Sequence, residues 1–220
     1  MDALILAGGE NKRLSVLKGF IEIKGKRIIE SNIELLSSIF DRVIISTNNP
    51  EIYFYLGVPM VGDILKYRGP MTGILSVLIS LEVPEIFVTA CDMPFIKPEL
   101  IRYIIDKWTQ NTDTCSAFSV QRSATKNSSL VTSHSLLKRW DAVISIFDKK
   151  PQPLLGIYSK RIAKSMEESI KQGEKSLKRF LQRIDVLYID EGKVRAIDPE
   201  GRSFININTM EDYKQVTSNE

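Results

Sequence analysis

Residues 3–13 read Ala-Leu-Ile-Leu-Ala-Gly-Gly-Glu-Asn-Lys-Arg, a short apolar run that meets two adjacent glycines and then charged residues. The apolar run Ala3–Leu6 predicts a buried strand. The pair Gly8-Gly9 allows positive φ and a close approach of the backbone to a ligand, and successive backbone N–H groups can bind an anion. Arg13 and Lys18 add positive charge. We interpret this stretch as a strand leading into a triphosphate-binding loop.

The spacing within this loop excludes two familiar nucleotide-binding motifs. It matches neither the G-x-x-x-x-G-K-[ST] pattern of a P-loop nor the G-x-G-x-x-G pattern of a dinucleotide-binding fold. A double glycine after a buried strand can also form a tight turn without binding any ligand. The choice between a phosphate-binding loop and a simple turn therefore depends on the other motifs of the chain.

Strand-like and helix-like patterns alternate along the chain. Further strands are expected at Arg42–Ser46, Pro59–Val61, Ile86–Ala90, Ala142–Phe147, Leu154–Tyr158, Val186–Ile189 and Phe204–Ile207. Apolar spacing and start signals predict helices over 29–40, 72–81, 98–108, 160–172 and 176–184. The alternation predicts an α/β fold with a mostly parallel sheet between two helical layers, and with antiparallel strands in the C-terminal half.

Composition narrows the class of protein. The chain has 220 residues, of which 43% are hydrophobic and 26% are charged, as in one ordinary globular domain. A net charge of +3 with scattered basic residues does not call for nucleic acid. Two cysteines and the single His134 argue against a zinc site, a disulfide framework and a histidine-based triad. No apolar stretch approaches the roughly 20 residues that span a bilayer, so we expect a cytoplasmic protein without membrane contact.

Polar residues follow the first four predicted strands, at the edge where such sheets bind ligands. The double-glycine loop follows the first strand, Asn48 the second, Asp63 the third and Asp92 the fourth. Mg²⁺ is held by one or two carboxylates together with substrate phosphates, which suits Asp92. Asp92 could instead cap the following helix, although Pro94 makes that less natural. Asn48 and Asp63 also suit simple turns.

Two further residues have both a structural and a functional interpretation. Thr209 begins the stretch Thr209–Asp212, and the simplest interpretation makes it the N-cap of a terminal helix. Lys18 has apolar neighbours, so its stem could lie along apolar surface with the ammonium group in water. At its distance from the double glycine it could also reach a bound phosphate.

Five ordered motifs together carry a resemblance to one enzyme family. They are Leu6–Gly9 with Arg13 and Lys18, Asp63 with Gly69–Ile74, Cys91–Phe95, Gln152–Tyr158, and Asn206–Asp212. The chain resembles the molybdenum cofactor guanylyltransferases, within the nucleotidyltransferase group of doubly wound, Rossmann-like, three-layer α/β/α proteins. It departs from the family pattern at Asn11, Leu14 and Ser15, within the first motif.

The resemblance implies transfer of GMP from GTP to molybdopterin, which forms molybdopterin guanine dinucleotide and pyrophosphate. It implies a nucleotide site formed by Leu6, Ala7, Gly8, Gly9, Lys18, Asn48, Asp63 and Asp92. It implies catalytic roles for Arg13, Lys18 and Asp92, with Mg²⁺ bound by Asp92. Transient contact with other molybdenum cofactor proteins is expected by analogy.

The same resemblance implies a single nucleotidyltransferase domain over residues 1–220. We expect residues 1–111 to be the nucleotide-binding half and 140–220 the acceptor-side half. The stretch 112–139 is longer than the family pattern, and its Ser- and Thr-rich composition favours a surface insertion. Two alternatives stay open: a cytidylyl- or sugar-phosphate nucleotidyltransferase, and a non-catalytic nucleotide-binding protein. Gly8 favours GTP, because cytidylyl relatives usually have alanine at this position. The departures from the family pattern at Leu14 and Ser15 keep the non-catalytic nucleotide-binding protein open as an interpretation.

Overall fold

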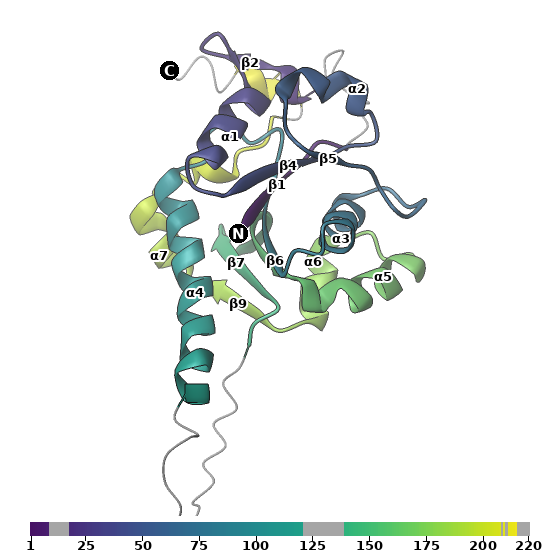
Figure 1. Cartoon of the computed structure of the whole chain (residues 1–220). Helices are drawn as coiled ribbons and strands as arrows, with labels where there is room; N and C mark the ends of the chain where they lie inside the picture. Colours follow the sequence, from purple (N-terminus) through teal and green to yellow (C-terminus); the bar gives the residue numbers. More distant parts are fainter. Residues whose placement is uncertain (9–17, 121–138, 208, 210, 215–220) are drawn as a thin grey trace, which may run out of the picture.

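The computed structural model (Figure 1) describes residues 1–8, 18–120, 139–207, 209 and 211–214. Its centre is a seven-stranded sheet in the order β5-β4-β1-β6-β8-β7-β9. The strands are β1 (Asp2–Leu6), β4 (Arg42–Ser46), β5 (Met60–Val61), β6 (Glu85–Ala90), β7 (Ala142–Phe147), β8 (Lys150–Ser159) and β9 (Val186–Ile189). Strand β8 is antiparallel to β6 and β7, and the other neighbouring pairs are parallel.

Helices cover both faces of this sheet (Figure 1). One face carries α1 (Ile28–Ser37), α4 (Pro98–Val120) and α7 (Glu191–Ile197), and the other carries α3 (Pro70–Ser80), α5 (Ala163–Lys171) and α6 (Leu177–Phe180). The central strands are apolar on both faces because both are covered: Ala3, Leu4 and Ile5 are fully buried. The predicted three-layer α/β/α fold is therefore confirmed.

Smaller elements connect these layers. A hairpin pairs β2 (Glu22–Ile23) with β3 (Lys26–Arg27) in antiparallel register. The remaining short helices are α2 (Pro50–Tyr53), η1 (Lys18–Phe20), η2 (Phe54–Leu56), η4 (Lys160–Ile162), η5 (Leu181–Arg183) and η6 (Arg202–Phe204). In the part of the chain that the structure describes, no helix is both long enough and apolar enough to cross a membrane.

The register of the central strands aligns their carboxyl ends. Leu6 of β1 pairs with Ser46 of β4 on one side and with Ala90 of β6 on the other. The ladder continues one residue further, because Ala7 N–H donates to Ser46 C=O at 2.9 Å and Cys91 N–H donates to Leu6 C=O at 3.1 Å. The loops after β1, β4 and β6 therefore leave the sheet at one level.

Two predictions about local structure were wrong. Residues 204–207 form no strand: η6 ends at Phe204, and the chain then crosses the loop after β6, where Ile207 N–H donates to Asp92 C=O at 3.0 Å. Gly201 adopts a left-handed conformation (φ 67°) that turns the chain before η6. Helix α4 also continues to Val120, beyond the end at residue 108 that the apolar spacing predicted. Residues 121–138 lie outside the described residues.

Candidate functional site

Four loop residues form a row along the carboxyl edge of the sheet. Because the strand order is β5-β4-β1-β6, the row reads Asp63, Asn48, Gly8 and Asp92. Neighbouring strands lie about 4.8 Å apart, so the row extends over roughly 14 Å. This length suits an extended ligand with different chemical groups at its two ends. The predicted residues Asn48 and Asp63, at the β4–β5 end, are held together directly.

Asn48 and Asp63 form two reciprocal hydrogen bonds. The Asn48 Nδ2 donates to Asp63 Oδ2 at 2.7 Å, and the Asp63 backbone N–H donates to Asn48 Oδ1 at 2.8 Å. Burial raises the pKa of the Asp63 carboxyl above its ordinary value, although the bond from Asn48 and the charge of Arg68 oppose that rise. The pair fixes a carboxylate and an amide at one end of the row. Such a pair can recognise the polar edge of a base.

Asp92 marks the other end of the row. It follows β6 and is 9% exposed, and its backbone carbonyl accepts the hydrogen bond from Ile207. No group of three or more His, Cys, Asp or Glu residues that could hold a metal occurs among the described residues. Mg²⁺ does not need such a cluster, since it commonly binds one or two carboxylates and takes its remaining ligands from water and phosphates. The donor set at this end therefore fits a divalent ion that arrives with a polyphosphate.

The predicted phosphate-binding residues are only partly within the described structure. Gly9 and Arg13 lie outside the described residues. For Lys18 the structure gives the backbone, which opens η1, and η1 lies against the end of β6: a Cβ built on Gly19 would be 3.4 Å from the Cβ of Cys91. The backbone of Lys18 is thereby placed beside the residue that precedes Asp92. The roles predicted for these side chains remain predictions.

The sequence analysis did not identify two buried residues whose side chains donate hydrogen bonds to the backbone at the ends of the central strands. Tyr53 of α2 is 3% exposed, and its hydroxyl donates to the backbone carbonyl of Ala7 at 3.4 Å. Burial raises the pKa of Tyr53 well above its ordinary value, so the hydroxyl keeps its proton. Asn32 of α1 is 2% exposed, and its Nδ2 donates to Ala90 C=O at 3.5 Å. Asn32 could have been identified from the sequence, because it is a polar residue on the apolar face of a predicted helix. No sequence feature indicated a role for Tyr53.

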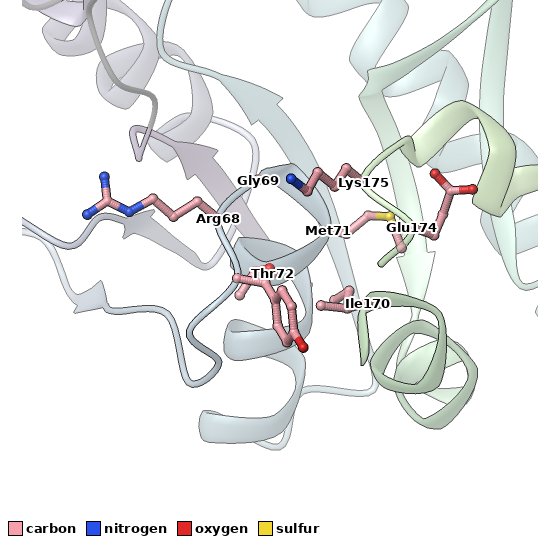
Figure 2. A pocket seen from close by; sticks show the side chains of 8 residues that line it. Arg68, Gly69, Met71, Thr72, Ile170, Glu174 and Lys175 are labelled. Atoms are coloured by element: carbon pink, nitrogen blue, oxygen red, sulfur yellow. The ribbon is translucent and has the colours of Figure 1, made fainter. Parts of the chain in front are cut away.

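A small pocket lies beside this edge, between the N-terminus of α3 and the C-terminus of α5 (Figure 2). Its lining includes Arg68, Met71, Ile170 and Lys175. The cavity volume is about 10 Å³, which is room for about one water molecule. It is therefore too small to be the binding site of a nucleotide base, and the row along the sheet edge is the better candidate.

Comparison with known proteins gives the family. Residues 3–187 match the model of the MobA-like NTP transferase domain. The chain belongs to this family. The match covers the whole row from Gly8 to Asp92, and it agrees with the resemblance seen in the sequence motifs.

Individual MobA-like relatives are similar over nearly their full length. A "Probable molybdenum cofactor guanylyltransferase" of Peptoclostridium acidaminophilum is 33% identical, over 99% of this chain and 90% of the relative. The molybdenum cofactor guanylyltransferase of Syntrophotalea carbinolica is 29% identical, over 97% of this chain and 89% of the relative.

Solved structures agree with the fold. The crystal structure of molybdopterin-guanine dinucleotide biosynthesis protein A from Archaeoglobus fulgidus superposes with a TM-score of 0.76 at 26% identity, covering 100% of this chain and 98% of that one. The manganese complex of Rv0371c from Mycobacterium tuberculosis has a TM-score of 0.58 at 12% identity, covering 100% and 98%, which shows the shared fold. The chain is thus a MobA-like nucleotidyltransferase by family and by fold.

Proposed function

We propose that this protein transfers GMP from GTP to molybdopterin, forming molybdopterin guanine dinucleotide and releasing pyrophosphate. The observation that carries the proposal is the row Asp63, Asn48, Gly8 and Asp92 along one sheet edge, with an amide–carboxylate pair at one end and a buried carboxylate at the other. The guanylyltransferases among the relatives support GTP as the nucleotide and molybdopterin as the acceptor.

The Asn48–Asp63 pair would receive the guanine. Guanine presents two adjacent N–H donors on its Watson–Crick edge, and a carboxylate accepts such a pair well. Cytosine presents a ring nitrogen acceptor beside its amino group, and this acceptor would face a carboxylate oxygen with no hydrogen between them, which is unfavourable. The pair is pre-organised by its two mutual hydrogen bonds, so little conformational entropy is lost when the base binds.

The loop after β1 would bind the phosphates. Ala7 N–H and Leu6 C=O already hold the sheet together. We therefore assign Leu6 and Ala7 to shaping the base end of the loop, with phosphate donors starting at Gly8 and Gly9. Arg13 and Lys18 would place positive charge beside the β- and γ-phosphates, which would stabilise the negative charge on the departing pyrophosphate.

The reaction needs positioning more than proton transfer. A terminal phosphate of molybdopterin is largely ionised at neutral pH, so its oxygen can attack the α-phosphorus of GTP without a general base. The new O–P bond forms as the bond to the β-phosphate oxygen breaks, and pyrophosphate leaves with its electron pair. Asp92 would hold Mg²⁺, which when bound neutralises phosphate charge. The presence of a single histidine in the chain is consistent with this scheme.

The test is pyrophosphate release in separate reactions with GTP, CTP and ATP, each with Mg²⁺ and molybdopterin. Release with GTP that greatly exceeds release with the other two supports the proposal. Preference for CTP, or silence with all three nucleotides, contradicts it. Asp92→Asn is the control, because it removes the charge of one carboxylate while keeping its size and should abolish any release that depends on this site.

A further inference from the structure

Gly19 is a buried residue in η1, directly after Lys18. A Cβ built on Gly19 would lie 3.3 Å from the Cβ of Ile29, 3.4 Å from the Cβ of Cys91 and 3.7 Å from the carbonyl oxygen of Cys91. Gly19 is not among the residues with positive φ, so backbone freedom does not explain the glycine. A side chain at this position would instead be packed tightly against Ile29.

Neither neighbour can move aside easily. The Cβ atoms of Ile29 and Cys91 are fixed by their own backbones, so a change of rotamer does not displace them. Ile29 is fully buried in α1, and Cys91 continues the sheet ladder through its bond to Leu6 C=O. The contact with Ile29 Cβ, at 3.3 Å, would be tighter than an ordinary van der Waals contact, and the contact with Cys91 Cβ, at 3.4 Å, would be at its lower limit. An added methyl group at residue 19 would therefore move η1 by a few tenths of an ångström relative to α1 and to the end of β6.

Such a shift would act on the proposed phosphate site. Lys18 precedes Gly19, and Asp92 follows Cys91, so the Gly19–Cys91 contact sets the separation of their two backbones. Asp92 is held from the other side, because its carbonyl accepts the bond from Ile207 and Ile207 packs against Ile21, two residues after Gly19. Residues 91 and 92 therefore lie against η1 and are hydrogen-bonded to the segment that contains Ile207.

We propose that Gly19 is a positioning residue that sets the distance between Lys18 and Asp92 at the triphosphate. The inference rests on the proposed roles of those two residues. Gly19 touches no substrate in this scheme and acts only by permitting close approach of η1 to the end of β6. Misplacement of an active-site group by about 1 Å can cost on the order of 100-fold in rate. By the same reasoning, we expect a shift of a few tenths of an ångström to weaken triphosphate binding by about 10-fold.

The experiment measures binding of inorganic triphosphate with Mg²⁺ by calorimetry, for the wild type and for Gly19→Ala. Gly19→Ala should weaken the affinity about 10-fold. The matched control is Ile29→Val, which removes one methyl group from the same neighbour but keeps the Cβ that faces Gly19, and it should leave the affinity within twofold. Combining Gly19→Ala with Cys91→Gly removes one of the crowding atoms and should recover part of the affinity, even if Gly19→Ala alone folds poorly.

A double-mutant cycle with Lys18→Ala separates positioning from general damage. If Gly19 acts through Lys18, adding Gly19→Ala to Lys18→Ala should change the triphosphate affinity less than twofold. An equal loss in both backgrounds, or no loss in either, overturns the inference, and so does an unchanged affinity of Lys18→Ala itself. Inorganic triphosphate carries neither guanine nor pterin, so a failure of GMP transfer would refute the proposed function and leave this result standing.

Discussion

The ion pair between Lys97 and Asp198 allows a stability prediction whose size follows from the structure. Asp198 is fully buried; its Oδ2 accepts Ser203 N–H at 2.8 Å, and its Oδ1 lies 3.5 Å from Lys97 Nζ. Removing one partner of a buried pair costs about 3–5 kcal/mol. Lys97 is 37% exposed and also donates to Ile197 C=O at 3.2 Å. We therefore expect Asp198→Ala to cost less, about 2–3 kcal/mol.

The assay is thermal and urea unfolding at pH 7. At about 2–4 °C per kcal/mol for a chain of this size, Asp198→Ala should lower the Tm by roughly 4–12 °C. The matched control is Glu167→Ala, which removes an exposed ion pair of 2.7 Å with Lys171 and should cost under about 0.5 kcal/mol. A cost for Asp198→Ala no larger than that of the control would show that the buried ion pair does not stabilise the fold.

The same pair predicts a pH dependence. Burial alone would raise the pKa of the Asp198 carboxyl, but the hydrogen bonds from Ser203 and the charge of Lys97 outweigh it and hold the pKa below its ordinary value. A lowered carboxyl pKa contributes stability above the unfolded-state value of about 3.9, and that stability is lost as the pH falls through the folded-state value. The difference in unfolding free energy between wild type and Asp198→Ala should therefore be full at neutral pH and shrink in acid.

Three further predictions concern the site. Asp92→Asn should lower kcat by at least about 100-fold in the pyrophosphate assay, and a variant with wild-type turnover would remove Asp92 from the mechanism. Asp63→Asn should weaken GTP binding. In the wild type, GTP affinity should fall as the pH drops, starting above the pH at which an ordinary carboxyl is protonated, because burial raises the pKa of Asp63. This acid-dependent fall in affinity should be absent in Asp63→Asn. Tyr53→Phe removes one hydrogen bond of 3.4 Å, so its unfolding free energy should fall by no more than about 1 kcal/mol, and a larger fall would show that the bond to Ala7 is more important than its length suggests.

The sequence predicts the sheet well where strands are short apolar runs between helices. Strands β1, β4 and β6 were predicted from such runs, because strands covered on both faces are mostly apolar. Residues 204–207 are also a short, mostly apolar run, yet they form no strand. Their conformation depends on the long-range bond from Ile207 to Asp92, which no local pattern records.

The candidate site was predictable as a list of residues and not as an arrangement. The position of Asn48 and Asp63 after successive strands indicated a shared edge, but their mutual hydrogen bonds required the three-dimensional structure. The order of the row depends on which strands are neighbours in the sheet. The proposed role of Gly19 was equally hidden, because its neighbour Cys91 is distant in sequence.

Transfer of GMP can be tested directly by following the α-phosphorus of GTP. The protein is incubated with Mg²⁺, molybdopterin and GTP labelled at either the α- or the γ-phosphorus, and the pterin product is identified by mass. We expect the α label in a pterin guanine dinucleotide and the γ label in pyrophosphate, with both signals lost in Asp92→Asn. Release of the γ label as free phosphate, or an α label that never joins the pterin, would contradict it.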